Sequence, residues 1–62
     1  MALLKRKVVL ARTTLGVELL HRLIEEGKFP KPIRIIPHRV AWIEAEVDER
    51  EEQRRKERDE AA

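Results

Sequence analysis

The sequence lacks the residues on which disulfide-stabilised, zinc-binding and acyl-transfer domains depend. It contains no cysteine and no tyrosine, and serine and asparagine are also absent. Without cysteine, neither a disulfide framework nor a thiolate zinc site can support the fold. Without serine or cysteine, most nucleophilic chemistry is excluded as well. We therefore expect a protein that is not an enzyme and that holds no cofactor and no metal ion.

Long apolar runs are missing too. The uninterrupted apolar stretches are only a few residues long, whereas about 20 residues are needed to cross a bilayer. The N-terminus also lacks the apolar region of a secretory signal. We expect a cytoplasmic protein with no membrane partner. At 62 residues the chain has room for one small domain, and a domain of this size buries only about 60% of its unfolded surface.

Charged residues, in contrast, are abundant and unevenly placed. They make up 42% of the chain, yet the formal net charge is only +2. Residues 1–43 carry nine Lys or Arg against three Glu, a net charge of +6, and residues 44–62 carry five Lys or Arg against nine acids, a net charge of −4. A basic body followed by an acidic tail is typical of polyanion binding, although such charges also serve solubility.

The first half of the chain predicts two short helices joined by a tight turn. Lys7–Thr13 has the apolar spacing of a short helix, and residues 14–16 interrupt it with a glycine. Val17–Glu26 is predicted to be a second helix, and Gly27 stands where a left-handed residue would end it. Its apolar stripe comprises Leu19, Leu20, Leu23 and Ile24. Two helices in this arrangement form a helix-turn-helix, whose second helix commonly enters the DNA major groove.

The second half predicts a hairpin and a long helix. Residues 29–32 include two prolines and cannot be helical. Residues 33–35 and 40–43 are predicted to be two strands around a turn at 36–39, and a helix follows from Glu44 almost to the C-terminus. An isolated hairpin is only marginally stable, so its apolar side chains should pack on the helices. The predicted packing residues are Phe29, Ile33, Ile35, Val40 and Trp42.

These elements predict an α+β fold that is mostly helical. It is a winged helix-turn-helix with two short helices, a two-stranded β-hairpin wing and a C-terminal helix. We expect residues 1–50 to form the DNA-binding domain. Residues 51–62 should form a charged helical extension that projects into the solvent.

Three segments of the chain carry a resemblance to a known family. They are LLKRKVVLARTTL at 3–15, RLIEEGKFPKPIRI at 22–35 and RVAWIEAEVD at 39–48. With these segments the chain resembles the AlpA-type prophage regulators and the related small excisionases, which share a winged-helix body with MerR-type domains. The middle segment, with GKFPKP before an alternating strand, is the most specific of the three.

The resemblance implies binding to double-stranded DNA and association with the nucleoid. The chain would act either as an excisionase (a recombination directionality factor), which bends attachment-site DNA and directs an integrase toward excision, or as a transcriptional regulator of a prophage or integrated element. The integrase, a tyrosine or serine recombinase, would be a partner. Because so small a domain contacts few phosphates, we also expect neighbouring copies of the chain on DNA. An alternative of another class is a protein-interaction module that docks through the charged C-terminal helix.

Three groups of side chains are the candidates for DNA contact. The second predicted helix would present to the major groove Glu18, His21, Arg22 and Glu25. The tip of the hairpin would present to a minor groove Arg34, His38 and Arg39. The predicted contacts to the DNA backbone are Lys5, Arg6, Lys7, Arg12, Lys28 and Lys31. In each group the alternative is an ordinary solvated surface.

The chain departs from the family pattern on the predicted reading surface. Relatives usually open the second helix with a Ser-Arg-Ser-Thr-like run followed by Tyr-Arg, whereas this chain has GVEL at 16–19 and then His21 and Arg22. Of the family's contacts here, only Arg22 carries over. Arg50 stands where relatives often have Trp, which predicts a weaker contact between the last helix and the body.

Overall fold

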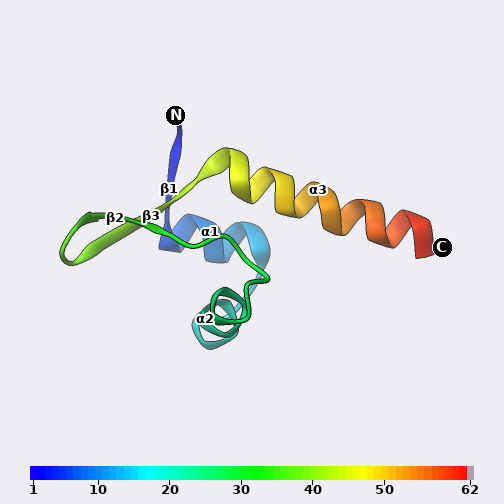
Figure 1. Cartoon of the computed structure of the whole chain (residues 1–62), viewed down its shortest axis with the longest axis horizontal. Coiled ribbons are helices and arrows are strands. Elements are labelled where there is room, and N and C mark those ends of the chain that lie inside the picture. The colour runs from blue at the N-terminus through cyan, green and yellow to red at the C-terminus, as the bar shows by residue number, and fades with distance from the viewer. Residues whose placement is uncertain (62) are drawn as a thin grey trace.

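The computed structural model describes residues 1–61 and contains the predicted elements in the predicted order (Figure 1). The helices are α1 (Arg6–Thr13), α2 (Val17–Glu25) and α3 (Glu44–Ala61). The strands are β1 (Leu3–Lys5), β2 (Ile33–Ile36) and β3 (Arg39–Ile43). This mixed, mostly helical arrangement confirms the predicted fold class, that of a winged helix-turn-helix. We refer to the β2–β3 hairpin, residues 33–43, as the wing.

Strand β1 was not predicted, and it changes the wing from a free hairpin into part of a three-stranded sheet. The strand order is β1-β3-β2, so β3 is central. Leu4 of β1 lies opposite Trp42, and Lys5 lies opposite Ala41, in an antiparallel register. Three residues are too few to show an alternating pattern. The strand exists because β3 offers it a partner, a condition that local sequence does not reveal.

The two ends of the helix-turn-helix follow from local chemistry. Helix α1 ends at Thr13, and the C-cap residue Thr14 adopts a left-handed conformation with φ of 60°. Helix α2 ends at Glu25, and Gly27 follows with a φ of 74°, which confirms the predicted left-handed residue. There the Gly27 amide donates to the carbonyl of Ile24 at 3.1 Å, and the Lys28 amide donates to that of Leu23 at 2.8 Å. This pair of hydrogen bonds is a Schellman motif, which satisfies the last carbonyls of the helix.

The core consists of one apolar side chain from each helix and one from β3, together with Phe29 of the loop after α2. Its buried members are Val9, Leu20, Phe29, Trp42 and Val47. The indole Nε1 of Trp42 donates a hydrogen bond to the Pro30 carbonyl at 2.9 Å, so the ring's only polar group is satisfied. Trp42 and Phe29 therefore have the predicted packing role. The sheet, the helix-turn-helix and the start of α3 all meet at this cluster.

Some apolar side chains that were predicted to pack are exposed instead. Ile33 is 38% exposed and Ile35 is 46% exposed, because β2 is an edge strand and the wing extends beyond the helices. Leu19 of α2 is also 43% exposed. The helix packs through Leu20, Leu23 and Ile24 alone, since a short helix buries only a narrow stripe.

Helix α3 leaves the body on the side opposite the wing, as Figure 1 shows. The molecule is therefore elongated, with principal extents of 43 × 26 × 19 Å. The helix runs without a break from Glu44 to Ala61. Contacts with the body reach as far as Arg50 and Glu51, one residue beyond the predicted domain. Within residues 1–61, no helix combines the length and the apolar character needed to span a membrane.

Candidate nucleic-acid interface

Two of the predicted groups of cations meet in one hollow between the start of α1 and the wing. This wing hollow has a volume of about 460 Å³. Its lining residues are Lys5, Arg6, Lys7, Arg34, Pro37, His38, Arg39 and Val40. Within residues 1–61, no acidic residue lines this hollow. The structure thus brings the three N-terminal cations together with all three of the predicted wing residues.

The backbone at the start of α1 adds to the positive potential of the wing hollow. The N-cap residue, Lys5, makes no capping hydrogen bond through its side chain, and the first turn of the helix contains no acidic residue. Cations at this end of a helix oppose its dipole and lower its stability. A bound anion would relieve that cost, because uncapped amide groups and nearby cations favour phosphate.

A second hollow connects the wing hollow with α2. This α2 hollow has a volume of about 260 Å³. It is lined by Arg6, His21, Ile24, Glu25, Pro32, Val40 and Trp42. Arg6 and Val40 line both hollows, so one surface runs from α2 past Arg6 to the wing. The sequence predicts a phosphate contact for Arg6, but it does not predict that Arg6 lies between the two hollows. That position depends on how α1, α2 and the wing pack together, which no sequence pattern shows.

The remaining predicted residues of α2 extend the same helix face. Glu18 and Arg22 are exposed. Glu18 lies three residues before His21, and Arg22 lies three residues before Glu25, spacings that keep side chains on one face of a helix. They do not line the α2 hollow. All four side chains therefore share the outer face of α2, with His21 and Glu25 nearest the sheet.

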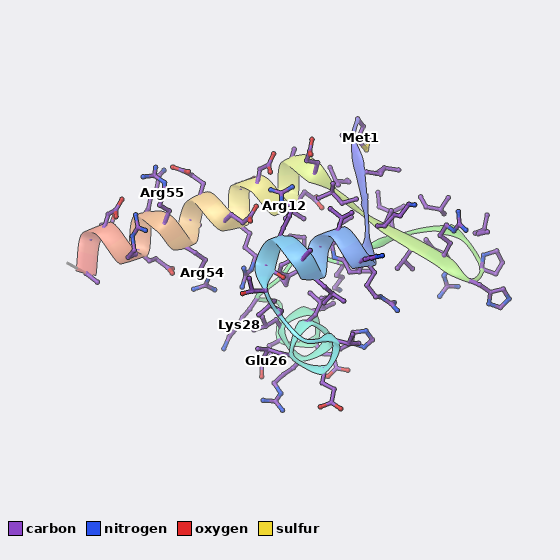
Figure 2. The ribbon with its side chains drawn as sticks, turned by 180° about the vertical axis from the view of Figure 1, so that it is seen from behind. Met1, Arg12, Glu26, Lys28, Arg54 and Arg55 are labelled. Carbon is purple, nitrogen blue, oxygen red and sulfur yellow. The ribbon has the colours of Figure 1, made fainter. Side chains whose placement is uncertain are left out.

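Arg12, which the sequence predicts to contact phosphate, pairs with carboxylates of α3. Its guanidinium donates to Asp48 of α3 at 2.5 Å and to Glu51, and it lies 3.9 Å from Glu44. Figure 2 shows Arg12 pointing from α1 toward α3. The hydrogen bonds to Asp48 and Glu51 raise the pKa of Arg12. Since three carboxylates already surround its charge, we leave Arg12 out of the interface and assign it to the contact between α1 and α3.

Lys28 and Lys31 lie elsewhere as well. Both line a third hollow, between α3 and the loop that follows α2. Lys28 also forms an ion pair with Glu26 at 3.4 Å (Figure 2). Because neither lysine lines the α2 or the wing hollow, the structure separates them from the surface that the other candidates share.

A helix-turn-helix beside a hairpin wing, with a cation-rich surface across both, defines the winged helix-turn-helix class. Over residues 2–55 the chain matches the family model described as "Prophage CP4-57 regulatory protein (AlpA)". It therefore belongs to the AlpA family of prophage regulatory proteins, which is a family of DNA-binding regulators and is not known for enzymes. The resemblance found in the sequence is thus confirmed. No curated protein and no solved structure gives a significant match.

Proposed function

We propose that this protein is an excisionase, which binds and bends attachment-site DNA so that an integrase acts in the direction of excision. The observation that supports it best is the continuous surface from the outer face of α2, past Arg6, to the wing. Helix α2 would enter the major groove, and the wing an adjacent minor groove. The cations of the wing hollow would hold the phosphates between them. The protein would act in the cytoplasm, on the nucleoid.

The tip of the wing supports the bending part of this proposal. Ile36 is 53% exposed and directly precedes Pro37 at the turn. Arg34, His38 and Arg39 flank these two apolar residues. Proteins that kink DNA often insert an apolar side chain between base steps while nearby cations hold the minor groove. Ile36 has the exposure and the neighbours for that role.

A second candidate function is transcriptional regulation of the prophage or integrated element, which the family description favours. A regulator would use the same DNA surface as an excisionase. The two functions differ in the protein that acts at the neighbouring DNA, which is RNA polymerase for a regulator and an integrase for an excisionase. An assay with purified integrase and a plasmid carrying both attachment sites distinguishes them. An excisionase should be required for excision in that mixture. A regulator should leave excision unchanged and alter transcription from a promoter near its site.

The assigned roles of α2 and α1 can be tested with two substitutions. Arg22→Ala should weaken binding to a duplex selected from a random pool by about 1–3 kcal/mol and weaken binding to unselected duplexes much less. Lys7→Ala should weaken both alike, because a phosphate contact carries no sequence information. Fluorescence anisotropy at one salt concentration measures both affinities for each variant.

Arg58→Ala is the matched control, because this exposed arginine lies near the end of α3 and pairs with Asp59. It should change neither affinity. If Arg22→Ala and Lys7→Ala weaken selected and unselected duplexes in the same proportion, the assignment of Arg22 to base contact is wrong. If no duplex binds the natural chain, the proposed function itself is wrong.

A further inference from the structure

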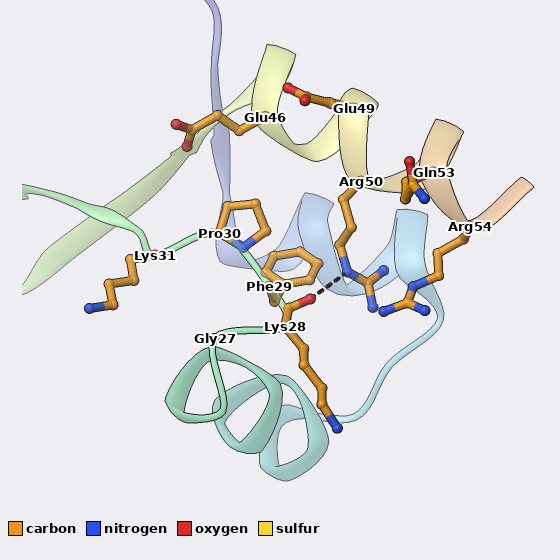
Figure 3. A pocket seen from close by; sticks show the side chains of 10 residues that line it. All are labelled: Gly27, Lys28, Phe29, Pro30, Lys31, Glu46, Glu49, Arg50, Gln53 and Arg54. Atoms are coloured by element: carbon orange, nitrogen blue, oxygen red, sulfur yellow. Dashed lines mark hydrogen bonds between the residues drawn. The ribbon is translucent and has the colours of Figure 1, made fainter. Parts of the chain in front are cut away.

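The third hollow lies on α3 and is separate from the proposed DNA surface. This α3 groove has a volume of about 740 Å³ and runs between α3 and the loop after α2 (Figure 3). Its lining residues are Gly27, Lys28, Phe29, Pro30, Lys31, Glu46, Glu49, Arg50, Gln53 and Arg54. None of them lines the α2 hollow or the wing hollow. A molecule bound in the groove would therefore leave the DNA surface free.

Arg50 is held in this groove by two contacts. Its Nε donates a hydrogen bond to the Lys28 carbonyl at 3.2 Å, and its guanidinium carbon lies 4.8 Å from the centroid of the Phe29 ring. Phe29 is only 3% exposed, so the ring is a rigid support. A guanidinium stacked on an aromatic ring and fixed through Nε has a defined orientation. Arg50 thus joins α3 to the loop after α2.

Arg54 lies one helical turn further along α3 and points into the same groove, beside the Arg50 guanidinium (Figure 3). Burial lowers the pKa of Arg50, and the charge of Arg54 lowers it further, whereas Glu51 and Glu57 act in the opposite direction. Arg54 itself pairs with Glu57 at 2.8 Å. Two arginines that repel each other side by side on one helix gain most from an anion that contacts both.

The other lining residues indicate which kind of anion fits. Pro30 lines the groove beside the buried Phe29 ring, and Glu46 and Glu49 line it on the same helix as the arginines, nearer the start of α3. A continuous phosphate backbone would be repelled by those two carboxylates. A short peptide can instead direct its own carboxylates to the arginines and keep them away from Glu46 and Glu49. Arginine pairs with carboxylate in a bidentate geometry.

We propose that the α3 groove binds an acidic segment of a partner protein, with carboxylates of that segment on Arg50 and Arg54. The groove would recruit the partner to DNA that α2 and the wing already hold. Glu26 and Glu57 pair with Lys28 and Arg54 in the free protein, and an incoming carboxylate would compete with them. Recruitment to DNA rests on the proposed function, whereas peptide binding by the groove does not depend on DNA, since the two surfaces share no residue.

The test uses the full chain and, as the probe, a short end-blocked peptide with two adjacent glutamates between glycines. Its binding is followed by ¹⁵N NMR. Saturable shifts are expected at the Arg50 Nε–H and at the amides of residues 27–31 and 50–54, with or without bound duplex. Arg54→Gln should lower the affinity for the peptide about five- to ten-fold, because it removes one charge-assisted contact. Arg50→Lys should lower the affinity for the peptide by a similar factor, since lysine keeps the charge but lacks the planar guanidinium that pairs with a carboxylate through two N–H groups.

Arg58→Gln is the matched control, because it removes the same charge from α3 outside the groove. It should leave peptide binding unchanged. The proposal is overturned if Arg58→Gln lowers the affinity for the peptide as much as Arg54→Gln does, or if duplex DNA displaces the peptide. It is also overturned if inorganic phosphate shifts the same resonances as strongly. Duplex affinity measured for the same variants tests the DNA function separately.

Discussion

Arg6 and Arg12 belong to the same short helix, yet they face different parts of the molecule. Arg6 lines both hollows of the proposed DNA surface, whereas Arg12 contacts Asp48 and Glu51 of α3. Two residues that are six positions apart in an α-helix point in directions that differ by roughly 240° around the helix axis, so their side chains contact different neighbours. Both were equally good candidates for phosphate contact in the sequence. Only the position of α3 distinguishes them.

This difference predicts opposite effects of the same substitution. Arg6→Gln should weaken DNA binding and leave the hydrogen-exchange protection of α3 unchanged. Arg12→Gln should lower the protection of the first turns of α3, because it removes their ionic contacts with α1, and should leave DNA affinity within about two-fold. Hydrogen exchange followed by NMR, together with fluorescence anisotropy, measures both properties. Loss of DNA affinity in Arg12→Gln without any change in α3 would contradict the reassignment of Arg12.

Helix α3 combines a packed start with a solvated remainder. Val47 is fully buried in the core, and Arg50 and Glu51 make the last contacts with the body. Beyond them the described side chains pair within the helix, as Arg55 does with Glu52 and with Asp59 at 3.3 Å. Exposed pairs of this kind contribute little to folding. The stability that α3 supplies to the domain therefore comes from its first two turns.

A truncation after residue 55 should consequently be tolerated. Its free energy of unfolding should fall by less than about 1 kcal/mol, because only exposed pairs are lost. Val47→Ala, in contrast, should lower it by about 1.5–3 kcal/mol through lost burial. Urea unfolding followed by the fluorescence of Trp42 compares the two. If the truncation proves as destabilising as Val47→Ala, the distal part of α3 has a structural role that its contacts do not reveal.

The whole molecule separates its charges along its length. The net charge of +6 lies in residues 1–43, which form the helix-turn-helix and the wing, and the net charge of −4 lies in residues 44–62. Because α3 leaves the body opposite the wing (Figure 1), its acids are held away from the phosphates that the wing hollow would contact. The nearly neutral total thus conceals a molecule with one basic end and one acidic end.

Such a molecule should bind DNA with a strong dependence on salt. Besides His38, the wing hollow has five cations, Lys5, Arg6, Lys7, Arg34 and Arg39. If each neutralises one phosphate, the logarithm of the binding constant should fall against the logarithm of salt concentration with a slope of about −4.5. Lys7→Ala should reduce the slope by about one. Titrations from low to physiological salt measure it, and a flat response would contradict phosphate contact by these residues.

Much of this fold was predictable because its signals are local. The prolines at 30 and 32 end the helical region, Gly27 supplies the left-handed residue after α2, and the acids from Glu44 suit the start of a helix. The roles of Ile33 and Ile35 were not predictable in the same way. An alternating pattern shows that two side chains share a strand face, but not whether a helix reaches far enough to cover that face.

The sequence by itself determined the helices, the wing, the charge of the two halves and membership of the AlpA family, because each of these depends on neighbouring residues or on their order. The tertiary structure decided the rest. It paired β1 with β3, placed Arg6 between α2 and the wing, turned Arg12 toward α3 and stacked Arg50 on Phe29. These outcomes join residues that are distant in the chain. Their energies depend on packing and geometry, which no local pattern encodes.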